Sequence, residues 1–121
     1  MRNVSKKFAE AFVKRYDRKF SNCHTDGENG FLFGNKISIF TNMQGNVNIT
    51  LTMAGYGTVT TRDRLNAILT EINSSWRFHQ RKHKQYLSGK LDDGREASIE
   101  ISNLKNGYVF DVKGELVGLT S

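Results

Sequence analysis

The first twenty residues carry the clearest helical pattern in the chain. Large apolar side chains recur there every four residues, at Val4, Phe8, Phe12, Tyr16 and Phe20. This spacing collects them on one face of a helix, and charged side chains take the opposite face. A polar run with two glycines at residues 25–30 ends the pattern. We therefore predict a helix over residues 4–19.

The middle of the chain changes to a period of two, which is typical of β-strands. Short apolar runs at residues 31–33 and 37–40 are bounded by Gly and Asn. Residues 47–53 alternate between apolar and polar side chains, which indicates a strand with one buried face. Turns that contain Gly and Asn are expected between these neighbouring strands.

A second helical pattern follows two closely spaced glycines. Its apolar side chains stand at helical spacing, at Leu65, Ile68, Leu69 and Ile72. They predict a helix over residues 61–73 with one face toward a sheet. Thr60 or Thr61 is expected to cap the start of this helix, because a threonine oxygen can accept a hydrogen bond from a free backbone N–H.

The last third of the chain is predicted to form further strands. The segments with strand patterns are residues 76–87, 99–101, 108–112 and 115–119. Turn sequences at residues 92–94 and 106–107 separate some of these segments. The order of predicted elements is therefore α-β-β-β-α-β-β-β.

This order indicates one domain of the α+β class, spanning residues 1–121. We expect an antiparallel sheet of about five to seven strands, with the helices 4–19 and 61–73 packed on one face. A chain of 121 residues can bury a core without covalent cross-links. Its single cysteine, Cys23, excludes an internal disulfide.

The formal net charge of +6 is distributed unevenly along the chain. Residues 1–20 contain seven Lys/Arg and two acidic residues, and residues 71–91 contain five Lys/Arg and one acidic residue. Residues 92–121 contain three Lys/Arg and six acidic residues. Two positive blocks of this kind favour an anionic partner, such as nucleic acid or an acidic protein surface.

The segment from Trp76 to Leu87 combines cations with aromatic rings and contains no acid. As one strand it presents two faces: Arg77, His79, Arg81 and His83 on one, and Trp76, Phe78, Gln80, Lys82, Lys84 and Tyr86 on the other. The basic face is expected to contact phosphates, and Trp76 and Phe78 to pack under the second helix. The alternative is an exposed strand that Lys and Arg keep soluble.

The residues predicted to bind come from both positive blocks and from the start of the second helix. They are Lys7, Lys14, Arg18, Arg62, Arg64, Arg77, Arg81, Lys82 and Lys84. We expect the first helix and the late strand to bring these cations into one surface. Near residues 58–62, the threonines indicate either a phosphate site or simple helix capping. Arg62 and Arg64 have a further alternative, which is pairing with acids of the C-terminal third.

No sequence spacing indicates catalysis or a metal site. On a strand, His79 and His83 lie ~13 Å apart, too far to share a metal. The cluster around Cys23 and His24 matches no zinc or calcium pattern, and this pair lacks an orienting acid. We therefore predict no catalytic residue, no metal ligand and no cofactor. An enzyme built from residues that are distant in sequence stays the alternative.

The central block resembles a small domain common among tailed-phage and mobile-element proteins. The similarity covers residues 34–89 and is most specific at T-T-R-x-R-L-N, which follows G-Y-x-T. The matching positions are Gly34, Asn35, Ile37, Gly55, Tyr56, Thr58, Thr60, Thr61, Arg62, Arg64, Leu65, Asn66, Gln80, Arg81, Lys82, Tyr86 and Gly89. This resemblance implies a context rather than a chemistry: a phage protein that acts by binding in the host cytoplasm.

Two functions are compatible with these observations. The first is binding of nucleic acid, DNA or RNA, through the cationic surface. The alternative is a phage effector that binds a host protein with an acidic surface, such as a defence or transcription enzyme, and inhibits or redirects it. Opposite charges at the two ends of the chain also permit a homodimer. We expect no membrane partner, because no apolar run approaches the ~20 residues of a membrane span.

Overall fold

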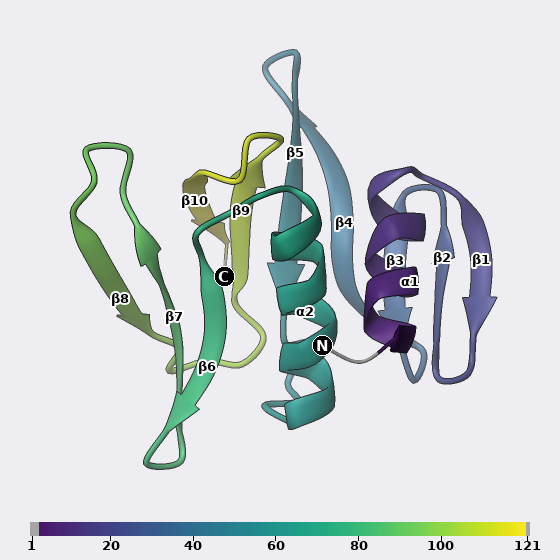
Figure 1. Ribbon diagram of the computed structural model, residues 1–121, viewed down its shortest axis with the longest axis horizontal. Coiled ribbons are helices and arrows are strands. Elements are labelled where there is room, and N and C mark those ends of the chain that lie inside the picture. The colour runs from purple at the N-terminus through teal and green to yellow at the C-terminus, as the bar shows by residue number, and fades with distance from the viewer. Residues whose placement is uncertain (1–2, 121) are drawn as a thin grey trace.

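The computed structural model describes residues 3–120, except for the side chain of Met43, and has two layers (Figure 1). The first layer is a seven-stranded antiparallel sheet with the order β1-β2-β3-β4-β5-β9-β10. Its strands are β1 (Asp17–Phe20), β2 (Cys23–Asp26), β3 (Asn29–Leu32), β4 (Asn35–Met43), β5 (Asn46–Thr52), β9 (Gly107–Asp111) and β10 (Leu116–Thr120).

The second layer packs on one face of this sheet. It consists of α1 (Asn3–Val13), α2 (Val59–Glu71) and a three-stranded sheet of β6 (Arg77–Arg81), β7 (Lys84–Lys90) and β8 (Glu96–Glu100). In Figure 1, α2 lies between α1 and β6. The predicted α+β class and the packing of both helices on one face are confirmed. The separate three-stranded sheet was not predicted.

One hydrophobic core joins the two layers. The rings of Phe12 in α1 and Phe40 in β4 stack with centroids 4.7 Å apart. At the other end of the core, the ring of Phe78 in β6 meets Tyr108 in β9 edge-on at 6.0 Å. Trp76 and Phe78 are 1% and 2% exposed, so their predicted place in the core is confirmed. These side chains therefore belong to the core and present almost no surface to solvent.

The first helix is shorter than the predicted range of 4–19. It ends at Val13, because the backbone turns left-handed at Arg15, where φ is 62°. The N–H of Tyr16 donates to the carbonyl of Ala11 at 2.9 Å, and the N–H of Arg15 donates to Phe12 at 3.0 Å. These two bonds form a Schellman motif, in which glycine usually takes the left-handed position. The prediction was wrong because the sequence places arginine there, and residues 17–20 then form β1.

The second helix begins two residues before the predicted range of 61–73. Thr58 is its N-cap, and the Thr58 side-chain oxygen accepts a bond from the N–H of Thr61 at 3.1 Å. The predicted caps, Thr60 and Thr61, both lie inside the helix. The hydroxyl of Thr61 is instead buried and lies 2.9 Å from the hydroxyl of Thr58.

The segment predicted as one strand over residues 76–87 is a hairpin. Lys82 and His83 have φ values of 50° and 67° and form a two-residue turn between β6 and β7. Such a turn normally contains Asn or Gly, which are less strained with positive φ. The sequence shows neither, so the turn gave no recognisable signal. Because the chain reverses, Arg81 pairs with Lys84 across the hairpin, and these two side chains share one face.

Arg64 and Asp63 hold α2 against α1, and Arg64 also contacts the turn between β1 and β2. Arg64 is only 1% exposed and donates to the hydroxyl of Ser5 in α1 at 2.5 Å and to the Oδ1 atom of Asn22 at 3.0 Å. The hydroxyl of Ser5 in turn donates to Asp63, and the Asp63 carboxylate lies 3.5 Å from the Arg64 guanidinium. A charge can be buried in this way because it has both a counter-ion and hydrogen bonds.

The side-chain amide of Asn66 forms the two hydrogen bonds with β6 that a neighbouring strand would otherwise form. Its Nδ2 atom donates to the carbonyl of Phe78 at 2.8 Å, and its Oδ1 atom accepts from the N–H of Phe78 at 2.7 Å. This pair of bonds satisfies backbone groups that would otherwise be unpaired at the edge of the three-stranded sheet. Asn66 thus fixes where β6 lies against α2.

We expect Asn66→Ala to destabilise the protein by about 2 kcal/mol, because it leaves two backbone groups of Phe78 without partners. Urea denaturation followed by circular dichroism measures this change. The matched control is Thr70→Ala, an exposed position on the same helix, which should change the stability by less than about 0.5 kcal/mol. Equal midpoints for Asn66→Ala and the unmodified protein would show that the amide does not hold β6.

Candidate functional site

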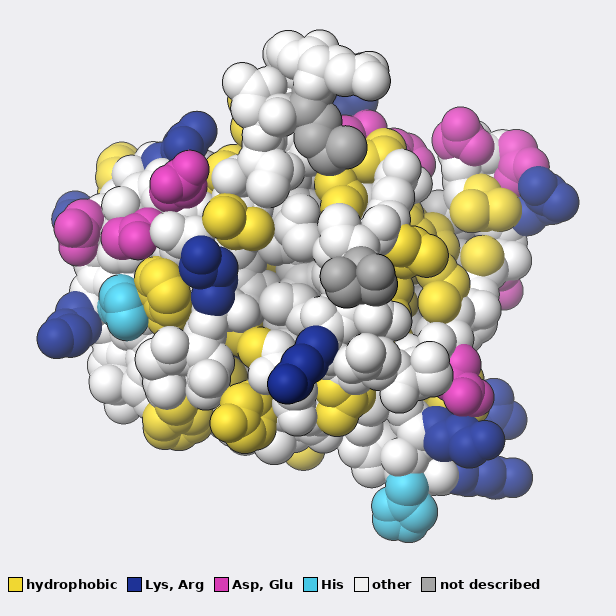
Figure 2. All heavy atoms as spheres, turned by 180° about the vertical axis from the view of Figure 1, so that it is seen from behind, with side chains coloured by type: hydrophobic (Ala, Val, Ile, Leu, Met, Phe, Trp, Pro, Cys, Tyr) yellow, Lys and Arg dark blue, Asp and Glu magenta, His cyan; other side chains and the backbone are white. Residues whose placement is uncertain are grey.

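The tip of the β6–β7 hairpin is a compact cationic patch. Arg81, Lys82, His83 and Lys84 follow one another and are all exposed. In Figure 2, dark-blue side chains and a cyan histidine gather at the protruding corner where the hairpin turn lies. One acid approaches the tip: the Glu100 carboxylate lies 3.8 Å from the Lys84 ammonium. Both groups are at least half exposed, so this pair is weak and leaves the patch positive.

The outer face of the three-stranded sheet adds two rings next to this patch. The imidazole of His79 stacks on the phenol of Tyr86 with centroids 5.5 Å apart and planes 21° from parallel. Both side chains are half-buried, so each ring keeps exposed surface. The two residues are opposite each other in β6 and β7, two pairs away from Arg81 and Lys84, so both pairs lie on the same face. The hairpin therefore presents cations and rings on one face, whereas a single strand would have separated Tyr86 from His79.

A groove of about 540 Å³ lies between the hairpin and the loop that precedes α2, with His83, Lys84 and Gly57 in its lining. Arg62 connects the two sides of this groove through hydrogen bonds. Its Nη1 atom donates to the carbonyl of Gly57 at 3.0 Å, to Gln85 Oε1 at 2.8 Å and to Gln80 Oε1 at 3.2 Å. Burial lowers the pKa of Arg62. This guanidinium therefore serves first to position the hairpin.

Two other predicted binding residues, Arg64 and Arg77, are held by contacts within the fold. Arg64 is buried, so its guanidinium offers no exposed cationic surface, and its acidic neighbour is Asp63 rather than a residue of the C-terminal third. Arg77 is half-buried and donates to the carbonyls of Ser74 at 2.7 Å and Trp76 at 2.6 Å. Burial lowers the pKa of Arg77.

The N-terminal block forms a separate patch. Lys7 and Lys14 are exposed, the first on α1 and the second just after it, and Arg18 is exposed on β1. The Arg18 guanidinium lies 5.0 Å from the centre of the Tyr16 ring and donates to the carbonyl of Asp17 at 3.0 Å. Because α2 lies between α1 and β6 in Figure 1, the two positive blocks do not merge into the single surface that we expected.

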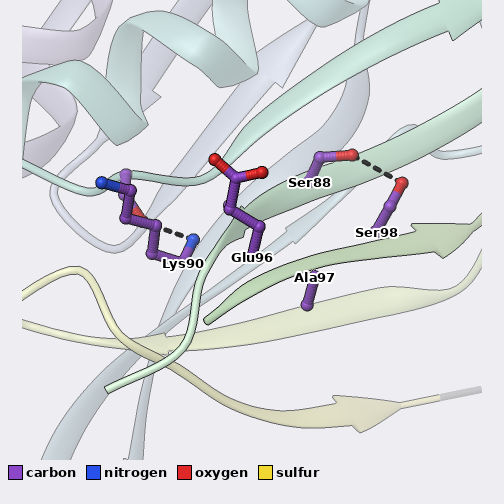
Figure 3. Close-up of a pocket in the computed structure, with 7 residues that line it drawn as sticks. Ser88, Lys90, Glu96, Ala97 and Ser98 are labelled. Carbon is purple, nitrogen blue, oxygen red and sulfur yellow. Dashed lines mark hydrogen bonds between the residues drawn. The ribbon is translucent and has the colours of Figure 1, made fainter. Parts of the chain in front are cut away.

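A second groove, of about 500 Å³, lies along β7 and β8 (Figure 3). Ser88 and Ser98 point toward one another there, with their hydroxyls 2.7 Å apart, and Ser88 also lies 2.7 Å from the Nε2 atom of His79. Among residues 3–120, His79 contacts only this hydroxyl and the Tyr86 ring. A serine nucleophile needs a base that a third group orients. The arrangement supplies no such group and positions the ring of His79 instead.

Cys23 and His24 do not form a pair. Cys23 is 3% exposed in the core, and His24 points to the other side of β2, where it stacks on Phe31 at 4.5 Å. Burial raises the pKa of the Cys23 thiol, although Arg64 acts in the opposite direction. Within the described part of the chain, no group of three or more His, Cys, Asp or Glu side chains is placed to hold a metal ion.

Comparison with known proteins identifies a phage protein family. A family model described as Kyanoviridae Gp96 protein matches residues 1–111, which include both helices and the strands up to β9. No curated protein and no solved structure matches the chain. The predicted resemblance to a phage domain family is confirmed, and it extends well beyond residues 34–89; the T-T-R-x-R-L-N motif stays a prediction. Neither helix within residues 3–120 is long and apolar enough to cross a membrane.

We expect the Cys23 thiol to react slowly with a thiol reagent while the protein is folded, because burial limits access and disfavours the thiolate. Labelling with Ellman's reagent should be at least about 100-fold slower in buffer than in denaturant, since reaction requires local opening. The double variant Cys23→Ser/Ser102→Cys, with the thiol at an exposed position, serves as the accessible control. Equal labelling rates for the two thiols would contradict this burial.

Proposed function

This chain belongs to the Kyanoviridae Gp96 protein family, and we propose that it is a small phage protein that binds single-stranded nucleic acid through the β6–β7 hairpin. The observation that carries the proposal is the face that Arg81 and Lys84 share with the stacked rings of His79 and Tyr86. Cations on this face bind phosphates, and exposed ring surfaces stack on bases.

A single strand fits this face better than a duplex does. The faces of bases are accessible for stacking only when the bases are unpaired. The half-buried rings of His79 and Tyr86 offer a ring surface beside the cationic tip. A strand that crosses the hairpin can therefore contact both at once. DNA and RNA both satisfy this requirement.

The proposed binding does not depend strongly on the base sequence of the nucleic acid. Reading a base edge requires side-chain amides or guanidinium groups that are free to form hydrogen bonds. Gln80 and Gln85 lie near the tip, but both accept bonds from Arg62, and the Gln85 amide also donates to Gln80 at 2.8 Å. These internal bonds favour contacts to the phosphates and base faces, which carry little sequence information.

The proposal assigns binding to the hairpin rather than to the N-terminal patch of Lys7, Lys14 and Arg18. The N-terminal block also has a stacked ring pair, His24 on Phe31, opposite Lys19 of β1. The predicted patch of Lys7, Lys14 and Arg18 is, however, spread over two elements, and the Arg18 guanidinium already lies over Tyr16. The host cytoplasm, where phage nucleic acid is copied and expressed, is the compartment in which this activity is useful.

Neutralising the tip should weaken binding and its dependence on salt. We expect Arg81→Ala/Lys82→Ala to lower the affinity for a fluorescent single-stranded 20-mer by roughly tenfold per lost phosphate contact at about 50 mM salt. The 20-mer is longer than the roughly 4–16 nucleotides that a small domain contacts. The slope of log affinity against log salt should fall by about 1 for each residue removed. Fluorescence anisotropy over a salt series measures both quantities.

The charge-matched control is Lys7→Ala/Lys14→Ala, which removes the same charge from the N-terminal patch. This pair should leave the salt slope nearly unchanged. An equal loss for both pairs would mean that total charge rather than the hairpin governs binding. If the affinity of the unmodified protein for the 20-mer does not depend on the salt concentration, the proposal is wrong.

A second candidate function, binding to a host protein, is favoured by the surface of β10. This edge strand contains no charged residue, and its side chains Val117 and Leu119 are 53% and 63% exposed. Figure 2 shows hydrophobic side chains gathered on the side of the molecule where β10 lies. Uncharged sheet edges of this kind can pair with a strand of another protein.

A pull-down from nuclease-treated host lysate tests this second candidate. If it is right, a protein should be retained by the unmodified chain and lost with Leu119→Lys, because a lysine at a sheet edge discourages pairing. Arg81→Ala/Lys82→Ala should retain the same protein. Recovery of nothing from the nuclease-treated lysate would leave nucleic acid as the partner.

A further inference from the structure

A pocket of about 520 Å³ opens beside the N-terminal end of α2. Its floor consists of the buried side chains of Leu32, Ile37 and Met53. Phe33 and Tyr56 also line it and keep large exposed surfaces, 70% and 53%. Exposed rings beside an apolar floor form a site on which a flat, uncharged group can stack.

The two rings have no aromatic partner of their own. Among residues 3–120, neither Phe33 nor Tyr56 takes part in a stacked or edge-on ring pair. Phe33 is also held in a left-handed conformation, with φ of 50°, in the two-residue turn that it forms with Gly34. A bulky side chain is rare in this region because it is strained there. Such strain at an exposed ring suggests a role for the ring outside the fold.

The lining indicates which chemical group fits. It contains no charged side chain, so the inserted group is uncharged. Asn35 contributes a half-buried amide, whose Nδ2 atom donates one long hydrogen bond, 3.4 Å, to the carbonyl of Phe33. This leaves the amide oxygen available as an acceptor. A flat ring with polar edges matches such a lining better than an aliphatic group does.

The pocket adjoins the groove at the hairpin through three consecutive residues. Tyr56 and Thr58 line the pocket, whereas Gly57 between them lines the groove, whose lining also contains His83, Lys84 and Glu100. The cationic tip of the hairpin borders this groove, so a ligand that reaches both the pocket and the tip needs an uncharged ring joined by a link to an anion. A nucleotide within a strand has this composition.

We propose that the pocket binds one unstacked nucleobase of a strand whose neighbouring phosphates lie on the β6–β7 hairpin. This inference rests on the proposed nucleic-acid binding and adds a defined base site to it. Because Phe33 and Tyr56 contact the faces of the ring, the site accepts purines and pyrimidines alike.

The test compares a single-stranded oligonucleotide with a strand of equal length that consists of abasic sites. We expect Phe33→Ala and Tyr56→Ala each to weaken binding of the normal strand about tenfold, because each removes a stacking partner. Binding of the abasic strand and the salt slope should not change. The matched control is Val59→Ala, since Val59 is 61% exposed near the pocket without lining it.

The fluorescence of an introduced tryptophan provides the second readout. Phe33→Trp should place an indole at the mouth of the pocket, and stacking on a base should quench its fluorescence with the normal strand but not with the abasic strand. The other tryptophan, Trp76, is 1% exposed and should contribute a constant background.

The outcomes separate the two proposals. If the normal strand binds with a salt dependence that Arg81→Ala/Lys82→Ala reduces, while the pocket variants behave as the unmodified protein, the base site is wrong and the hairpin function stands. If neither strand binds, both proposals are wrong. If Phe33→Ala instead releases a protein captured from nuclease-treated lysate, the pocket belongs to a protein partner and the base site is overturned.

Discussion

The fold depends on how α2 holds its neighbours through three polar side chains at alternate positions. In a helix, residues two apart point about 200° from one another, whereas residues four apart share a face. Arg64 therefore points toward α1, where it meets Ser5, and Arg62 and Asn66 point toward the three-stranded sheet. One short sequence, R-x-R-x-N, thus fixes α1 on one side of the helix and the hairpin on the other. Apolar packing alone would allow these parts to slide, because it is not directional.

The same contacts determine where the candidate site lies. Arg62 binds the carbonyl of Gly57 and the amides of Gln80 and Gln85, so it connects the loop before α2 to the β6–β7 hairpin. These bonds constrain the position of the cationic tip relative to the loop that contains Tyr56. A preorganised site of this kind loses less conformational entropy on binding than two independent loops would lose. The predicted T-T-R-x-R-L-N motif contains the three residues that make these contacts, Arg62, Arg64 and Asn66.

Sequence patterns predicted the fold class and both helices, because apolar periodicity reports burial directly. They could not predict which cations are exposed. Arg64 and Arg81 look alike in the sequence, yet Arg64 is 1% exposed and Arg81 is on the surface. The difference comes from Ser5 and Asn22, which are far from Arg64 in the chain and supply its hydrogen bonds. The three-stranded sheet was missed for a related reason, since its hairpin turn contains neither Gly nor Asn.

Two of the turns that depart from the usual turn rules lie at the candidate site. Lys82 and His83 occupy left-handed positions that Asn and Gly would fill with less strain, and Phe33 does the same in the turn between β3 and β4. At the hairpin tip, an Asn-Gly turn would remove one cation and the histidine. At the pocket, Asn or Gly in place of Phe33 would remove an exposed ring that packs against no other ring of residues 3–120. The sequence thus retains side chains that strain the backbone at the two points where the proposed function requires a charge and a ring.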